Sequence, residues 1–135
     1  MENLRITRAR DRLVGATPNA LVDPSTLVGT WLNYDPSSRG IFRVIIAGER
    51  GALSVRIFGS GDPSPIDWGE TPADAFAGDV ASEEAVGFKA FYALESLRTM
   101  LLSYLNNRLL VVDAYTTFHD GSGRSSYFSR DHFYL

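Results

Sequence analysis

Short apolar runs separated by clusters of turn residues begin at Thr26 and continue to the end of the chain. Several of these runs alternate apolar and polar residues with a period of two, which is typical of half-buried β-strands. The pattern predicts eight strands: Leu27 to Asn33, Ile41 to Ala47, Leu53 to Ile57, Ala73 to Ala77, Val86 to Tyr92, Arg98 to Leu105, Leu109 to Phe118 and Ser126 to Leu135. No long helical pattern crosses between them, so we expect consecutive strands to pair as an antiparallel meander.

The joints between the last strands carry hairpin chemistry. Asn106-Asn107-Arg108 and Asp120-Gly121-Ser122-Gly123 are rich in residues that tolerate the positive φ angles of tight turns. The stretch from Gly59 to Pro72 holds three glycines and three prolines, which predicts a long shaped loop. A helix over Ala85 to Tyr104 is the alternative to two strands there, because the run contains Leu, Met, Ala and Glu, but a period of two fits its first half better.

The edges of the sheet decide the architecture. Eight antiparallel strands in an open sheet would expose two unpaired edges, whereas closure into a barrel removes both. We therefore predict an all-β fold, an antiparallel up-and-down barrel of about eight strands over residues 26–135, with a short arm over residues 1–25. The arm has apolar anchors such as Leu13 and Leu21, so it either plugs one end of the barrel, packs on a partner subunit or remains a mobile tail.

Composition supports one soluble globular domain. The chain has 135 residues, of which 44% are hydrophobic and 21% charged, enough for a single core. A net charge of -3 without long runs of one sign argues against nucleic acid as a partner. The absence of cysteine excludes disulfides, thiolate metal sites and a cysteine nucleophile. The N-terminal segment is charged throughout, which argues against a signal peptide or a membrane span, so we expect no membrane partner and a cytoplasmic protein.

The familiar catalytic signatures are missing from the chain. It contains no P-loop, no dinucleotide fingerprint, no His-Glu-x-x-His and no Gly-x-Ser-x-Gly elbow. His119 and His132 are its two histidines, and neither stands in a carboxylate cluster at ligand spacing. We therefore expect no metal site and no cofactor.

Asp113 is the best catalytic candidate, because it interrupts an otherwise apolar strand. If its carboxyl group points into the lumen, it needs a hydrogen-bond partner or a raised pKa and becomes a natural general acid, base or ligand anchor. If the group points outward, Asp113 is an ordinary solvated residue. Strand parity leaves both open, and we favour the outward orientation.

Polar and aromatic residues on several strands are candidates for ligand contact. Tyrosines on four predicted strands could converge inside a barrel, although aromatic residues are common in sheets for packing reasons. An acid beside a tryptophan on a loop either gates a pocket or covers the core at the barrel mouth. The candidate ligand-binding residues are Asn33, Tyr34, Asp67, Trp68, Tyr92, Tyr104 and Tyr115.

Val28-Gly29-Thr30-Trp31 on the first predicted strand resembles the Gly-x-Trp signature of the calycin barrels, the lipocalins and avidins. The resemblance implies a barrel whose tryptophan, here Trp31, closes one end and packs against an arginine near the end of the last strand, a position that Arg130 occupies here. From about Leu27 onward the chain is also similar to uncharacterised bacterial lipocalin-like domains with a loop like Pro63-Ser64-Pro65-Ile66-Asp67-Trp68-Gly69. Cysteines often bracket the prolines in that group, and their replacement here excludes a disulfide or redox role for the loop.

Three functions fit these observations. The leading hypothesis is binding of a small, partly apolar molecule in the barrel lumen. The alternative is a cofactor-independent cyclase or isomerase of bacterial secondary metabolism, in which the cavity folds the substrate and Asp113 or a tyrosine moves a proton. The third is a protein-interaction module that acts through its surface, including a homodimer.

Overall fold

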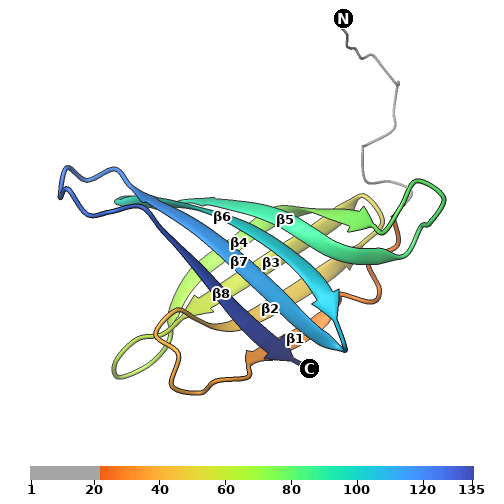
Figure 1. Cartoon of the computed structure of the whole chain (residues 1–135), viewed down its shortest axis with the longest axis horizontal. Coiled ribbons are helices and arrows are strands. Elements are labelled where there is room, and N and C mark those ends of the chain that lie inside the picture. Colours follow the sequence, from red (N-terminus) through yellow and green to blue (C-terminus); the bar gives the residue numbers. More distant parts are fainter. Residues whose placement is uncertain (1–21) are drawn as a thin grey trace, which may run out of the picture.

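Eight antiparallel strands close into a barrel in the computed structural model, which describes residues 22–135. Each strand pairs with its neighbours in sequence order, and β8 returns to β1, as Figure 1 shows. The strands are β1 (Gly29–Asn33), β2 (Ile41–Glu49), β3 (Ala52–Gly59), β4 (Ile66–Ala77), β5 (Ala85–Ala93), β6 (Leu97–Asn106), β7 (Leu109–Phe118) and β8 (Tyr127–Tyr134). The predicted up-and-down barrel is confirmed. Most of the predicted arm lies outside the described residues.

Two of the predicted hairpin turns have the expected backbone geometry. Asn107 and Arg108, between β6 and β7, have φ angles of 51° and 68°. Two successive residues with positive φ are the signature of the tight turn that matches the twist of antiparallel strands. Gly121 and Gly123, between β7 and β8, have φ angles of 73° and 74°. These turns fix the register of the last three strands.

The region from Gly59 to Pro72 differs from the prediction. The expected loop ends at Pro65, and β4 begins at Ile66 and continues through Pro72, which is paired with Ser54 of β3. A register shift between β3 and β4 and a positive φ of 87° at Gly69 accommodate the irregular sequence within the ladder. A β-bulge of this kind allows a strand to continue through residues that would otherwise end it. Asp67 and Trp68 therefore lie on a strand and not on a loop.

The segment that allowed a helix is β5 and β6. Gly87 of β5 lies so close to β6 that a Cβ atom there would stand 2.1 Å from the carbonyl oxygen of Ser103. A side chain at that position would collide with the neighbouring backbone, so glycine is needed for the two strands to pair. Within residues 22–135 no helix is long and apolar enough to cross a lipid bilayer.

The barrel lumen is filled by the protein's own side chains. Inward-facing residues from all eight strands form one apolar cluster that also contains Leu27. Leu101, Leu110 and Phe133 expose none of their surface to a water-sized sphere, and Phe88 exposes 2%. Walls of a ligand-sized cavity would be accessible to such a sphere, so these values describe a packed interior, as expected for a barrel of eight strands.

The seam between β1 and β8 closes the barrel with a short ladder. Two residue pairs, Leu32 with Tyr134 and Asn33 with Phe133, form its register. One residue further on, the backbone N–H of Tyr34 donates to the carbonyl oxygen of His132 over 2.7 Å. Nearer the start of β8, this strand lies beside the connection between β1 and β2, where the Ser38 hydroxyl donates to Asp131 over 3.1 Å.

Candidate functional site

Trp31 and Arg130, the expected closure pair, are not brought together. Trp31 lies in the lumen with 2% of its surface exposed, and its indole N–H donates to the carbonyl oxygen of Leu27 over 2.8 Å. Arg130 is the cross-strand neighbour of Asp113, whose flanking residues Val112 and Ala114 point into the lumen. Because side chains alternate between the two faces of a strand, Arg130 lies on the outer face of the barrel.

Asp113 points outward and is covered by Arg130. The guanidinium group donates to both carboxylate oxygens, over 2.7 Å from Nε and 2.9 Å from Nη2, and Asp113 keeps only 7% of its surface exposed. The carboxylate of Asp113 raises the pKa of Arg130 through these hydrogen bonds and through its own negative charge. Tyr104 and Tyr115 share this outer face and are both partly exposed. The best catalytic candidate and two candidate ligand contacts therefore lie outside the lumen.

Tyr92 and Trp68 meet at one end of the lumen. The hydroxyl of Tyr92 donates to the carbonyl oxygen of Gly69 over 2.6 Å, and burial raises the pKa of this hydroxyl to about 12. The ring of Trp68 stands edge-on to Tyr92 at 5.6 Å between centroids, and it covers Gly59. Tyr92 belongs to the buried core and Trp68 packs against it, so both aromatic residues serve the packing of the barrel.

Asp67 is separated from its neighbour Trp68 by the alternation of the strand. It forms an ion pair with Arg56 on the outer face of β3, and its carboxylate accepts the N–H of Gly69 over 2.8 Å. The hydrogen bonds from Arg56 and Gly69 hold the pKa of Asp67 below its ordinary value, and the one from Arg56 has the larger effect. The predicted acid and tryptophan thus do not form one gate.

A hollow of about 430 Å³ lies along the β1–β8 seam, and it includes three residues from the sequence prediction, Asn33, Tyr34 and Arg130. Together the residues that line it are Asn33, Tyr34, Asp35, Leu109, Arg130, Asp131 and His132. We call this set the seam hollow. Its volume falls at the lower end of the range for small-molecule sites.

Asn33 builds a wall of the seam hollow through its own hydrogen bonds. Its amide nitrogen donates to the carbonyl oxygen of Ile41 over 2.7 Å, and its amide oxygen accepts the N–H of Asp35 over 2.8 Å. Tyr34 has 68% of its surface exposed and stands edge-on to Tyr134 at 6.2 Å. Asn33 therefore shapes the hollow, while Tyr34 offers a free aromatic face.

Two carboxylates give the seam hollow a negative character. The N–H and hydroxyl of Ser37 donate to Asp35 over 3.0 and 2.7 Å and lower the pKa of this carboxyl group. The carboxylate of Asp131 accepts a hydrogen bond from the hydroxyl of Ser38. The charge of Arg130 is already matched by Asp113, so the two remaining acids leave the lining with an excess of negative charge at neutral pH.

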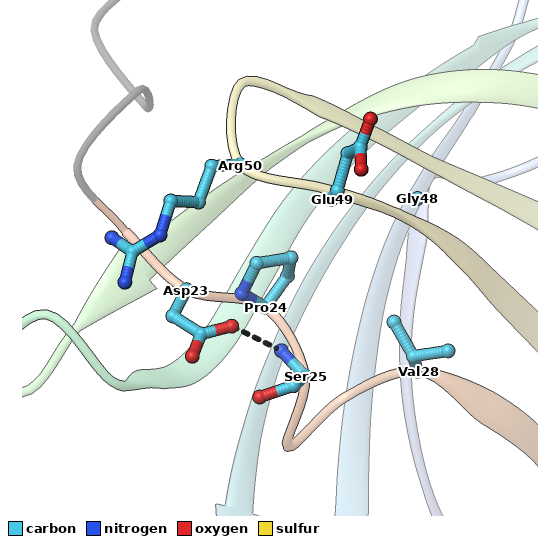
Figure 2. A pocket seen from close by; sticks show the side chains of 7 residues that line it. All are labelled: Asp23, Pro24, Ser25, Val28, Gly48, Glu49 and Arg50. Carbon is cyan, nitrogen blue, oxygen red and sulfur yellow. Dashed lines mark hydrogen bonds between the residues drawn. The ribbon is translucent and has the colours of Figure 1, made fainter.

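Two further hollows are lined by described residues. The one in Figure 2, about 530 Å³, lies beside the β2–β3 turn, and Asp23, Glu49 and Arg50 are among the residues around it. Arg50 also donates to Glu83 over 3.0 Å. The other, about 340 Å³, is an outer groove across β4, β5 and β6. None of the residues that line the hollow in Figure 2 is aromatic, so it has no ring on which a planar ligand can stack, whereas the seam hollow has Tyr34.

Comparisons with known protein families, with curated proteins and with solved structures gave no match to this chain. The eight-stranded antiparallel barrel is compatible with a calycin-type fold, and membership of that group remains a prediction. Among residues 22–135, no three side chains of His, Asp or Glu gather closely enough to hold a metal ion.

Sequence reasoning missed Asp35, Leu109 and Asp131 as parts of the site. Asp35 stands in a cluster of turn residues, where an acid is usual. Asp131 alternates with exposed residues of the last strand. Their proximity depends on how the β1–β2 connection lies against β8, and no local pattern in the sequence encodes that contact.

Proposed function

We propose that this protein binds a small, partly apolar molecule, and that it does so at the seam hollow of the barrel. The observation that carries the proposal is the convergence there of a free aromatic face, Tyr34, with charged residues from β8 and from the β1–β2 connection. Small-molecule sites combine an apolar wall with a few polar groups in this way. The packed lumen argues against binding deep inside the barrel.

The lining suggests the chemistry of the ligand. The exposed ring of Tyr34 can stack on a planar ring. Asp35 and Asp131 favour a group that carries positive charge or donates hydrogen bonds. The hollow is open to solvent on one side, so binding will be of modest strength. A planar ring with an attached amine can stack on Tyr34 and at the same time donate hydrogen bonds to Asp35 or Asp131.

The first experiment is native mass spectrometry of the protein purified from its own host. A small molecule that co-purifies with the folded protein would support the proposal and identify the ligand. The second is a titration with tryptamine, which carries an indole ring and an ammonium group, followed by backbone amide chemical shifts. We expect the shifts to centre on residues 33–35 and 130–132.

A pair of tyrosine variants sharpens the titration. Tyr34→Ala removes the proposed stacking face, so we expect the dissociation constant for tryptamine to rise about tenfold. Tyr127→Ala is the matched control, because Tyr127 also has more than half of its surface exposed but does not line the seam hollow. Indole-3-propionate, which carries a carboxylate in place of the amine, should bind more weakly than tryptamine. Equal binding by the wild type and Tyr34→Ala would refute the site.

A further inference from the structure

The first half of β8 is paired on one side only. Residues Tyr127 to Asp131 pair with β7, whereas the ladder with β1 on the other side is limited to the last residues of β8. β1 ends at Asn33, and Figure 1 shows the chain turning away from β8 after this point. Within the described residues 22–135, the first half of β8 therefore has no neighbouring strand in the place where a longer β1 would lie.

This side of β8 presents four main-chain hydrogen-bonding groups. The carbonyl oxygen of His132 accepts the N–H of Tyr34, so the main-chain groups of His132 face the β1 side. Such groups point to the same side at every second residue of a strand. The N–H and C=O groups of Arg130 and Phe128 thus also face the β1 side, and no main-chain group of residues 22–135 pairs with them there. We call these four groups the β8 edge.

The connection between β1 and β2 leaves the β8 edge accessible. It approaches β8 through the hydrogen bond from Ser38 to the carboxylate of Asp131. Asp131 is the cross-strand neighbour of Val112, which points into the lumen, so the carboxylate meets the connection on the inner side of the strand. Phe128 and Arg130 are both exposed. An unpaired and exposed edge of this kind is a template for the addition of another strand.

We propose that the β8 edge binds a short peptide with a free amino terminus and an aromatic first residue, which adds to the sheet as an antiparallel strand. The inference rests on the proposed function, because it assigns the ring and the amine at the seam hollow to the first residue of the peptide. In strand addition, main-chain hydrogen bonds supply affinity and side-chain pockets supply specificity. The two parts are contiguous here, since Arg130 belongs to both the β8 edge and the seam hollow.

The charges of the seam hollow select the direction of the peptide. A strand antiparallel to β8 follows the direction of β1, so its amino terminus lies at the end of the edge near Tyr34. The terminal ammonium group is then beside Asp35 and Asp131, the two carboxylates of the hollow. A parallel strand that ended there would bring its own carboxylate to the same acids, and like charges repel.

The register follows from the positions of the free groups. The first residue of the peptide lies opposite Arg130 and the third opposite Phe128, so each pair exchanges two main-chain hydrogen bonds. Tyr34 lies opposite His132, two positions before the first residue of the peptide. Side chains two positions apart share one face of a sheet, so the first ring of the peptide becomes the neighbour of the Tyr34 ring. The third side chain lies beside the exposed ring of Phe128, which favours a β-branched residue.

The probe is the peptide Trp-Thr-Val with an amidated carboxyl terminus. It begins with the indole ring and ammonium group of tryptamine and adds up to three main-chain hydrogen bonds to β8, so we expect it to bind at least about tenfold more tightly than tryptamine. Backbone amide chemical shifts of the full-length protein give both dissociation constants. A nuclear Overhauser contact between the α protons of Ser129 and of the peptide threonine checks the register, because these two residues form the close pair between the hydrogen-bonded ones.

Two N-methylated forms of the peptide are matched to each other. Methylation of the valine nitrogen removes the N–H that donates to the carbonyl oxygen of Phe128, and it should weaken binding about tenfold. Methylation of the threonine nitrogen alters an N–H that points away from β8, and it should change the dissociation constant by less than about twofold. Acetylation of the amino terminus removes the charge beside Asp35 and Asp131, and it should weaken binding about tenfold.

The outcomes separate this inference from the proposed function. Equal dissociation constants for the two N-methylated peptides, or a bound peptide without the contact to Ser129, would overturn the strand addition. If tryptamine still shifts the signals of residues 33–35 in that case, the proposed function stands and the strand addition alone fails. If neither tryptamine nor the peptide shifts those signals, both fail.

Discussion

The two faces of the β6–β7 hairpin are made from alternate residues of the same strands, and they differ in what their side chains contact. On the inner face, Leu101 is fully buried and the hydroxyls of Thr99 and Thr116 bond to each other over 3.1 Å. On the outer face, Met100 and Leu102 are more than a third exposed, and Leu102 is the cross-strand neighbour of Asp113, which pairs with Arg130. The inner face has all its partners within the chain, whereas the outer face keeps apolar surface available. The inner face therefore serves stability, and the outer face is where binding is to be sought.

Adjacent leucines on β6 give the largest test of this difference. Leu101→Ala removes a fully buried side chain, and we expect it to lower the free energy of unfolding by about 3 kcal/mol. Leu102→Ala makes the same chemical change one residue away on the outer face, and we expect a loss below about 1 kcal/mol. Urea denaturation followed by tryptophan fluorescence measures both. Similar losses for the two variants would show that the faces do not differ in this way.

The fold was predictable because its strongest signals are local. Alternation along β3 and β5 and the turn residues around Asn107 are each contained in a few consecutive residues, and all lead to the same barrel. β4 was harder, since Gly69 and Pro72 are local signals for a loop. They are accommodated by a register shift against β3, which depends on a strand far away in the sequence.

The site was less predictable because strand parity does not say which face is the inner one. Tyr92, Tyr104 and Tyr115 looked alike in the sequence, yet the first is in the lumen and the others are outside. The calycin resemblance predicted that Arg130 would reach Trp31, but the register of β8 turns Arg130 outward toward Asp113. Contacts of this kind are set by register over the whole barrel.

Tyr92 provides a second contrast, through pH. Burial raises its pKa from 10.0 to about 12 in the folded protein. Above pH 10 the unfolded chain therefore loses this proton first, which favours unfolding. The contribution of Tyr92 to stability is complete below pH 10 and is lost as the pH rises towards 12, by up to about 2 kcal/mol.

The measurement is the free energy of unfolding between pH 9 and pH 12 for the wild type and two variants. Tyr92→Phe removes the ionisable group, so its stability should fall less steeply over this range. Tyr104→Phe removes a partly exposed tyrosine from the outer face and should follow the wild type. If Tyr92→Phe follows the wild-type curve instead, the hydroxyl is not held in the buried environment described here.

The smallest expected effect tests the exception on the outer face, the buried carboxylate of Asp113. Asp113→Asn keeps the shape of the side chain but removes its charge, so the free energy of unfolding should fall by about 1 kcal/mol. Asp67→Asn is the matched change, because Asp67 forms the same kind of cross-strand pair with Arg56 but has a side chain that is 39% exposed, against 10% for Asp113. We expect its effect to be smaller and to vanish in high salt, since exposed charges are screened more strongly than covered ones. If the two variants lose the same stability at every salt concentration, then burial under Arg130 does not distinguish Asp113, and the outer face of β7 is uniformly a solvated surface.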